Sequence, residues 1–340
     1  MRSQAILSTA LMLVFSSASC DDKYTLKNDL PPRFEWDNND GYCGEVSLIS
    51  AGLYYGQYIS QYDVRALISR GAPQNKCQLL VGINDHLAIS KLHLNSITWN
   101  TVAEQDTDQF VAWIKQMVVK GYPVSIGVYM NQYRFNGDTN PHAGDPDYDH
   151  IVPVIEVASN SPLTNPHYFS DDIIYFSDNG LWGKSSHPPY FFQYGADDFQ
   201  ATRVEANAKD GNIFSLPNTA SNYGTAITGI VDLNGDTLPV RVDTNVNYEK
   251  PVIKDGSNKR PSPMPLALKI TISKLEPGVL YHLYRYNTLS SVPASYFNAH
   301  ASSAYKSWQF SIDSGSTYTL KEVIQSDEIA IYRAVKSSAP

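Results

Sequence analysis

Helical periodicity is confined to roughly the first two thirds of this 340-residue chain, and only short strand-like segments follow from about residue 212. A chain of this length is expected to form two domains. A segment that mixes helices with strands, followed by strands alone, argues against a regular βαβ alternation. The sequence therefore predicts an α+β domain over residues 35–210 and an all-β domain over residues 215–340.

The first segment carries four helix signals, followed by strand signals. Apolar Val46, Ile49 and Leu53 share one face of the first helix, and Thr107 begins the clearest of the others as its N-cap. The expected helices span residues 41–56, 63–70, 84–94 and 107–120, and the expected strands span residues 123–130, 151–157 and 173–176.

The second segment has the spacing of a β-sandwich of immunoglobulin or fibronectin type. Asn234-Gly235 indicates a β-hairpin between the two strands that flank it. Residues 232–236 resemble a calcium loop, but Asp243 stands where the loop requires glutamate, so we interpret them as a turn. The expected strands span residues 227–233, 238–242, 267–272, 279–286, 305–312, 316–320 and 328–334.

The N-terminus predicts export. Arg2, an apolar run over residues 5–15 and small residues over 17–19 form a secretory signal peptide, residues 1–19. Cys20, which follows it, is either a lipid attachment site, a flexible terminal residue or a partner of Cys77. No later stretch reaches the roughly 18 apolar residues that a membrane span needs. We therefore expect a secreted protein, extracellular or periplasmic, without a transmembrane segment.

Charge and cysteine content exclude two further classes. Lys and Arg total 26 and Asp and Glu total 34, a net charge of −8, and no basic stretch is present. Nucleic-acid binding requires a basic surface, so that function is not expected. Three cysteines are too few for a disulfide scaffold.

Cys43 is the predicted nucleophile. It lies between Gly41 and Gly44 at the start of the first helix. The positive end of a helix dipole favours a thiolate, and the flanking glycines leave room for a substrate backbone. A buried or disulfide-bonded cysteine is the alternative interpretation.

His150 is the predicted base, because it opens the strand over residues 151–157, where a side chain is held rigidly at the edge of a cleft. A third group should orient its imidazole. Asp178, at the end of the next strand, is the first choice, and Asn179 is the alternative.

An oxyanion donor should lie near the thiol. The main-chain N–H of Cys43 supplies one donor, and a side-chain amide from Asn38 or Asn39 could supply another. Ordinary helix capping by Asn39 or Asp40 is the competing interpretation.

These motifs together resemble the papain-like cysteine peptidases, and in particular the bacteriocin-processing, double-glycine-leader branch. The resemblance is carried by Tyr42-Cys43-Gly44-x-x-Ser47-Leu48, by Lys120-Gly121-Tyr122-Pro123-Val124, by Asp149-His150-x-Val152-x-Val154 and by the strand that ends at Asp178. It covers residues 35–205 and implies Cys43 as nucleophile, His150 as general acid and base, and Asp178 as the orienting residue.

The resemblance implies cleavage of peptide or isopeptide bonds in a peptide or protein substrate, without a cofactor or metal. The family's glutamine oxyanion donor, six residues before the cysteine, is replaced here by Asp37, so Asn38 or Asn39 would have to substitute for it. The same cysteine motif also resembles phytochelatin synthase, which transfers the acyl group to an amine. The alternatives are therefore an acyl transferase, or an inactive module whose sandwich domain binds a surface polymer or protein. An active enzyme is expected to hold Cys43 and His150 as a thiolate–imidazolium pair.

Overall fold

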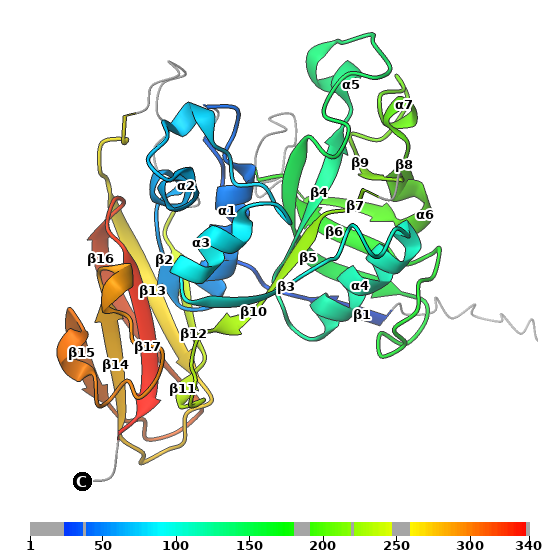
Figure 1. The fold of residues 1–340 in the computed structure, drawn as a ribbon. Coiled ribbons are helices and arrows are strands. Elements are labelled where there is room, and N and C mark those ends of the chain that lie inside the picture. The colour runs from blue at the N-terminus through cyan, green and yellow to red at the C-terminus, as the bar shows by residue number, and fades with distance from the viewer. Residues whose placement is uncertain (1–23, 37–38, 180–190, 219–220, 247–258, 338–340) are drawn as a thin grey trace, which may run out of the picture.

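The computed structural model describes residues 24–36, 39–179, 191–218, 221–246 and 259–337. It combines helices with mainly antiparallel sheets, which confirms the predicted α+β class (Figure 1). The predicted signal peptide and Cys20 lie outside the described residues. Among the described residues, no helix is both long and apolar enough to cross a membrane.

The helices are α1 (Cys43–Tyr54), α2 (Gln61–Ser69), α3 (Asp85–Lys91), α4 (Thr107–Val119), α5 (Gln132–Asn136), α6 (Ala196–Phe199) and α7 (Arg203–Ala206), with 3-10 turns η1 (Gln74–Lys76), η2 (Leu289–Ser291) and η3 (Ala301–Ser303).

The largest sheet has nine strands, six of them in the order β3-β10-β4-β5-β6-β7. β1 adds to β5 and β9 adds to β4, and among the strands that the structure describes only the short β8–β9 pair is parallel. The strands are β1 (Tyr24–Lys27), β3 (Leu94–Thr98), β4 (Val124–Met130), β5 (His150–Ser159), β6 (Ile173–Ser177), β7 (Phe191–Gly195), β8 (Gln200–Ala201), β9 (Phe214–Pro217) and β10 (Gly224–Ile230).

Helices α1 and α4 pack against opposite faces of this sheet. Val152 and Val154 of β5 share a buried apolar cluster with Phe110 and Ile114 of α4. Ile151 instead contacts Cys43, the first residue of α1. Because consecutive strand residues point to opposite faces, β5 is covered by a helix on each side.

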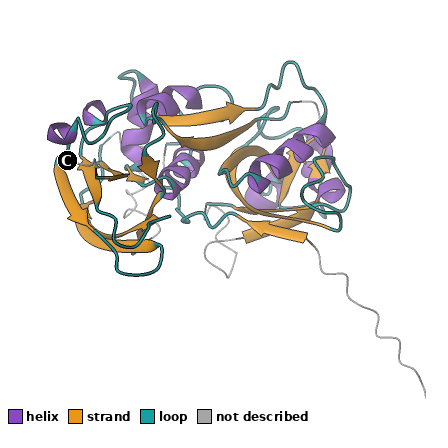
Figure 2. Ribbon diagram, turned by 90° about the horizontal axis from the view of Figure 1, so that it is seen from below, coloured by secondary structure: helices purple, strands orange, loops and turns teal. Residues whose placement is uncertain are grey.

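Two smaller antiparallel sheets form the C-terminal half, which lies at one end of the molecule (Figures 1 and 2). Leu268 and Ile270 of one sheet share a core with Leu283 and Tyr332 of the other, so the sheets pack face to face as a sandwich. One sheet contains β2 (Gln57–Tyr58), β11 (Thr237–Leu238), β14 (Tyr281–Tyr286), β15 (Lys306–Phe310) and β17 (Ala330–Lys336), and the other contains β12 (Val240–Thr244), β13 (Pro265–Ser273) and β16 (Thr317–Gln325). Its immunoglobulin or fibronectin type stays a prediction.

Helix α1 lies between the large sheet and the sandwich, and all its residues from Gly44 to Leu53 are buried. Leu48 and Leu53 belong to the same apolar cluster as Leu268 of β13. Strand β2, just after α1, pairs with β17 near the C-terminus, with Tyr58 opposite Ala330. The sandwich therefore shares one hydrophobic core with α1, whereas the face of the large sheet under α4 has a separate core.

The predicted domain boundaries need correction. The sheet of the first half includes β1, which precedes residue 35, and β9 and β10, which follow residue 210. The boundary predicted between residues 210 and 215 is therefore too early, because β10 inserts between β3 and β4. A strand that joins a sheet from a distant part of the chain carries no local sequence signal that identifies its partner strand.

The predicted hairpin at Asn234-Gly235 is also wrong. Asp232 accepts hydrogen bonds from the N–H groups of Gly235 and Thr237, and Gly235 has φ +70°, so a tight turn does form. However, β10 before the turn belongs to the large sheet and β11 after it pairs with β17. The turn is the crossing point between the two halves.

A shared core predicts one cooperative unfolding transition for both halves. Leu268→Ala should destabilise the protein by about 2–5 kcal/mol and lower the unfolding temperature of the whole molecule. Val323→Ala, on the neighbouring strand but 66% exposed, should change stability by less than about 0.5 kcal/mol. Differential scanning calorimetry checks both variants, and two transitions of which only one responds to Leu268→Ala would contradict the shared core.

Candidate active site

Cys43 is the first residue of α1, and the turn before it has an unusual backbone. Asn39, Asp40 and Gly41 have φ of 51°, 62° and 86°, all in the left-handed region. A Cβ at Gly41 would lie 3.3 Å from a carboxylate oxygen of Glu35, and one at Gly44 would lie 2.2 Å from the main-chain oxygen of Leu79. Close approach of the Leu79 main chain therefore requires glycine at position 44, and the left-handed backbone favours glycine at position 41.

A buried arginine holds this turn in place. Arg65 of α2 forms an ion pair with Glu45 of α1 at 2.7 Å, and both side chains are at most 1% exposed. Arg65 also donates to the main-chain oxygens of Asn39 and Gly41, and its guanidinium lies 3.6 Å from the centroid of the Tyr42 ring. The Arg65 cation thus interacts with three carbonyl or carboxylate groups around the start of α1.

His150 opens strand β5, as predicted, and the residues before it are well anchored. The carboxylate of Asp149 accepts the N–H of Met130 at 2.8 Å and pairs with Arg203 of α7. The imidazole of His150 stacks on Phe214 with 5.7 Å between ring centroids and is 1% exposed.

The protonation of the His150 ring follows from its hydrogen bond. Its Nε2 lies 2.9 Å from the main-chain oxygen of Asp178. A carbonyl oxygen can only accept, so Nε2 carries the proton and Nδ1 carries the lone pair. This arrangement leaves Nδ1 available as a base.

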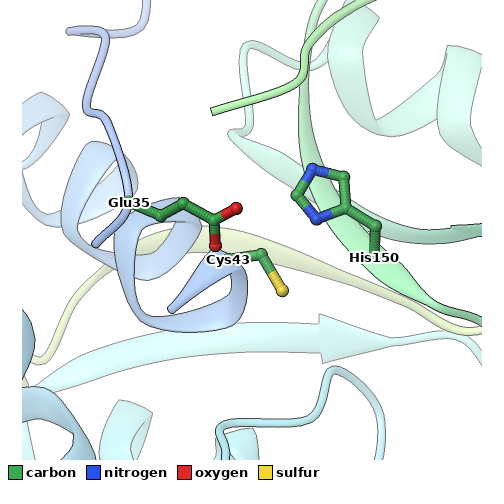
Figure 3. A group of neighbouring side chains, drawn as sticks. All are labelled: Glu35, Cys43 and His150. Carbon is green, nitrogen blue, oxygen red and sulfur yellow. The ribbon is translucent and has the colours of Figure 1, made fainter. Parts of the chain in front are cut away.

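The side chains of Glu35, Cys43 and His150 converge on one point (Figure 3). Each offers one oxygen, sulfur or nitrogen atom, and these three atoms lie within 4.8 Å of one another. Cys43 and Glu35 are partly exposed, whereas His150 is buried. The thiol therefore lies close to both an imidazole and a carboxylate.

The protonation states in this cluster differ from the expected ion pair. Burial raises the pKa of the Cys43 thiol, and the carboxylates of Glu35 and Glu45 raise it further. Main-chain hydrogen bonds from Ile151 and Gly44 to the sulfur act in the opposite direction but are weaker. Burial also lowers the pKa of His150 to about 4. The resting pair is thus a neutral thiol beside a neutral imidazole, and the predicted thiolate–imidazolium pair is not favoured.

The two candidates for the third residue have different positions. Asp178 contacts His150 through its main-chain carbonyl, whereas the sequence analysis expected its side chain to do so. The amide nitrogen of Asn179 lies 3.4 Å from the main-chain oxygen of Cys43, 3.2 Å from Ser47 Oγ and 3.0 Å from the main-chain oxygen of Ile151. Asn179 therefore ties the end of β6 to α1 and β5.

Of the two predicted side-chain oxyanion donors, the structure describes Asn39. Asn39 donates its amide to the Tyr42 hydroxyl at 3.1 Å, within the turn that precedes α1. Asn38 and Asp37 lie outside the described residues. Glu35 is the side chain that does lie beside the thiol, and its Oε2 accepts the N–H of Tyr42 at 3.0 Å.

Glu35 and Arg65 were missed by sequence reasoning. The search upstream of Cys43 considered only amides, and no spacing rule places a carboxylate eight residues before a thiol beside it. Arg65 lies in a polar-looking helix, although Val64 and Ile68 around it predict a buried face.

The Arg65–Glu45 pair provides a direct test of how the nucleophile helix is held. Arg65→Ala should destabilise the protein by about 3–5 kcal/mol, because it leaves the Glu45 carboxylate buried without its partner. Arg260→Ala is the matched control: this arginine pairs with Asp63 of the same helix, but is 39% exposed and should contribute at most about 1 kcal/mol. Urea unfolding measures the change in unfolding free energy for both variants. Equal changes would refute the larger contribution expected of the buried pair.

Comparison of the chain with protein-family models, with curated proteins and with solved structures returned no match.

Proposed function

We propose that this protein is a papain-like cysteine hydrolase that cleaves peptide or isopeptide bonds through a thioester on Cys43. The observation that carries the proposal is the placement of a partly exposed thiol at the start of α1, within 4.8 Å of an imidazole whose Nδ1 is unprotonated. Acyl transfer to a side chain requires three groups: a nucleophile, a base and a group that orients the base.

The topology around the pair supports the same proposal. The cysteine begins a buried helix that packs on an antiparallel sheet, the histidine begins a central strand, and Asp178 follows the end of the neighbouring strand. This order of parts is the one that the resemblance to papain-like peptidases implies. It agrees with the motifs around Cys43 and His150.

The chemistry starts from the neutral pair. Nδ1 of His150 takes the thiol proton as the sulfur attacks the substrate carbonyl carbon, giving a tetrahedral oxyanion and an imidazolium. The imidazolium protonates the leaving amine, the C–N bond breaks and a thioester remains. The same nitrogen then deprotonates a water molecule, whose attack releases the acid and restores the thiol. Attack by an amine in place of water would give acyl transfer, so product analysis separates these two reactions.

Stabilisation of the oxyanion falls to the main chain. The N–H of Cys43 lies in the first turn of α1, where no carbonyl of a preceding turn is available to accept it. An ionised Glu35 cannot donate a hydrogen bond, and its Oε2 already accepts the N–H of Tyr42. We therefore assign the Cys43 N–H as the donor within the described residues.

The proposal also assigns roles to the N-terminus and to the sandwich half of the chain. We assign secretion to residues 1–19, and recognition of a peptide, protein or surface polymer to the C-terminal sheets. An immunoglobulin-like or fibronectin-like sandwich presents loops and edges for such contacts. No residue of the Glu35, Cys43 and His150 cluster comes from it.

Cleavage of a peptide library tests the proposal directly. Cys43→Ala should reduce turnover to background, and His150→Ala should reduce kcat/KM by about 10³-fold or more. Asp178→Ala should cost less, since the main-chain carbonyl that bonds His150 remains. Cys77→Ser and the exposed His86→Ala are the controls and should retain activity. A Cys43→Ala protein that still cleaves its substrate would end the proposal.

The neutral resting pair predicts how alkylation of Cys43 depends on pH. Because the pKa of Cys43 is raised, its thiolate fraction is small at neutral pH and should grow about tenfold per pH unit. Iodoacetamide labelling, followed at Cys43 by peptide mass spectrometry, should therefore be slow at pH 5–6 and rise steadily with pH. A rate that is high and constant between pH 5 and pH 8 would instead indicate a preformed thiolate–imidazolium pair.

A further inference from the structure

Glu35, Cys43 and His150 differ in chemistry, yet the structure gathers one atom of each at a single point. Glu35 comes from the segment before α1, Cys43 from the first turn of α1 and His150 from the start of β5 (Figure 3). Their oxygen, sulfur and nitrogen atoms lie within 4.8 Å of one another. Within the described part of the chain, this is the group of three such residues that lies close enough to hold a metal ion.

We propose that Glu35, Cys43 and His150 form a binding site for one Zn²⁺ ion, which reversibly blocks the thiol. The binding of Zn²⁺ rests on the three side chains alone. The inhibition of an enzyme by this binding rests on the proposed function. Zinc accepts sulfur, nitrogen and oxygen ligands together, and three protein ligands leave its fourth position for water.

The spacing suits a tetrahedral ion after small side-chain movements. Usual zinc–ligand bonds place neighbouring ligand atoms about 3.3–3.6 Å apart, compared with the limit of 4.8 Å in the unliganded cluster. Small rotations of the Glu35 and Cys43 side chains would bring the ligand atoms to this distance.

Each ligand also has an outer contact of the kind that metal sites use. His150 donates its Nε2–H to the main-chain oxygen of Asp178, so Nδ1 is left for the metal. The sulfur accepts main-chain N–H groups from Ile151 and Gly44, and Glu35 accepts the N–H of Tyr42. These contacts orient the ligands and delocalise the negative charge of the thiolate and carboxylate.

The charges of the site balance. Glu45 is paired with Arg65, and the Glu35 carboxylate lies beside the sulfur. On binding, the thiol loses its proton to solvent and the sulfur forms a bond to zinc. One thiolate and one carboxylate then neutralise the two positive charges of the ion, which lowers the cost of holding it beside the buried imidazole.

The bound ion would occupy both parts of the catalytic pair. The sulfur lone pair and the Nδ1 lone pair would each be committed to the metal, so neither nucleophile nor base would remain for a substrate. Removing zinc with a chelator would restore both groups without any covalent change.

Cobalt and zinc titrations of the full chain test the site. Co²⁺ should give a near-ultraviolet thiolate-to-cobalt absorption band with one ion per chain, and Zn²⁺ should displace it. Cys43→Ala should abolish the band, and His150→Ala should weaken Zn²⁺ binding by more than about 100-fold. Glu35→Gln should weaken it by about tenfold or more, because it removes one charged ligand.

Three controls match these variants by residue type. Cys77→Ser, His86→Ala and the exposed Glu104→Gln should bind Zn²⁺ like the unaltered protein. Circular dichroism verifies that each variant is folded, and Cys43→Ser provides a second test of the thiol if Cys43→Ala is unstable. Loss of the band in Cys77→Ser, or Glu35→Gln with unchanged affinity, would overturn the three-ligand site.

The binding readout is independent of turnover, so the two proposals can fail separately. Zinc binding at Cys43 in a protein without peptidase activity would reject the proposed function and support the metal site. If Zn²⁺ leaves the peptidase activity unchanged at concentrations that saturate the site in the cobalt-competition assay, the proposed block is overturned.

Discussion

The buried ion pair between Arg65 and Glu45 is the interaction on which the position of the thiol depends. It joins α2 to α1, and the same guanidinium holds the carbonyls of two left-handed residues before Cys43. Glu45 in turn accepts the N–H of Leu79, the residue whose main chain touches Gly44. A buried charge that satisfies so many groups at once leaves the turn few alternative conformations. The reactive group is thus positioned by electrostatics inside the protein, and it is not merely carried at the end of a regular helix.

Placement of α1 between two layers explains the chemistry that surrounds it. Its buried surface faces β5 on one side and the sandwich on the other, so the first turn emerges where the layers meet. The low-polarity surroundings favour neutral forms of both Cys43 and His150. The same surroundings favour a neutral cluster over a single charge, which is a requirement that the proposed acyl transfer and the proposed metal binding share. Both proposals depend on the lone pair of His150 Nδ1.

Local sequence patterns predicted the main elements of the site but not its long-range partners. The helix at Cys43 and the strand at His150 follow from apolar periodicity and flanking glycines, which act within a few residues. The insertion of β10 between β3 and β4 joins segments separated by about 100 residues, and no local pattern encodes it. Asp178 contacts His150 through its main-chain oxygen and not through the predicted side chain, and a backbone carbonyl can make this contact from any residue type. Glu35 was missed because its approach depends on the three left-handed residues that reverse the chain before α1.

Pairing of β2 with β17 also constrains the order in which the protein can be assembled. Tyr58 lies opposite Ala330 and donates its hydroxyl hydrogen to the main-chain oxygen of Ser326. During synthesis the N-terminal part of a chain usually folds first. Here β2, which directly follows α1, has no sheet to join until β17 has left the ribosome. A nascent chain therefore carries Cys43 on an incompletely packed helix until β17 has emerged.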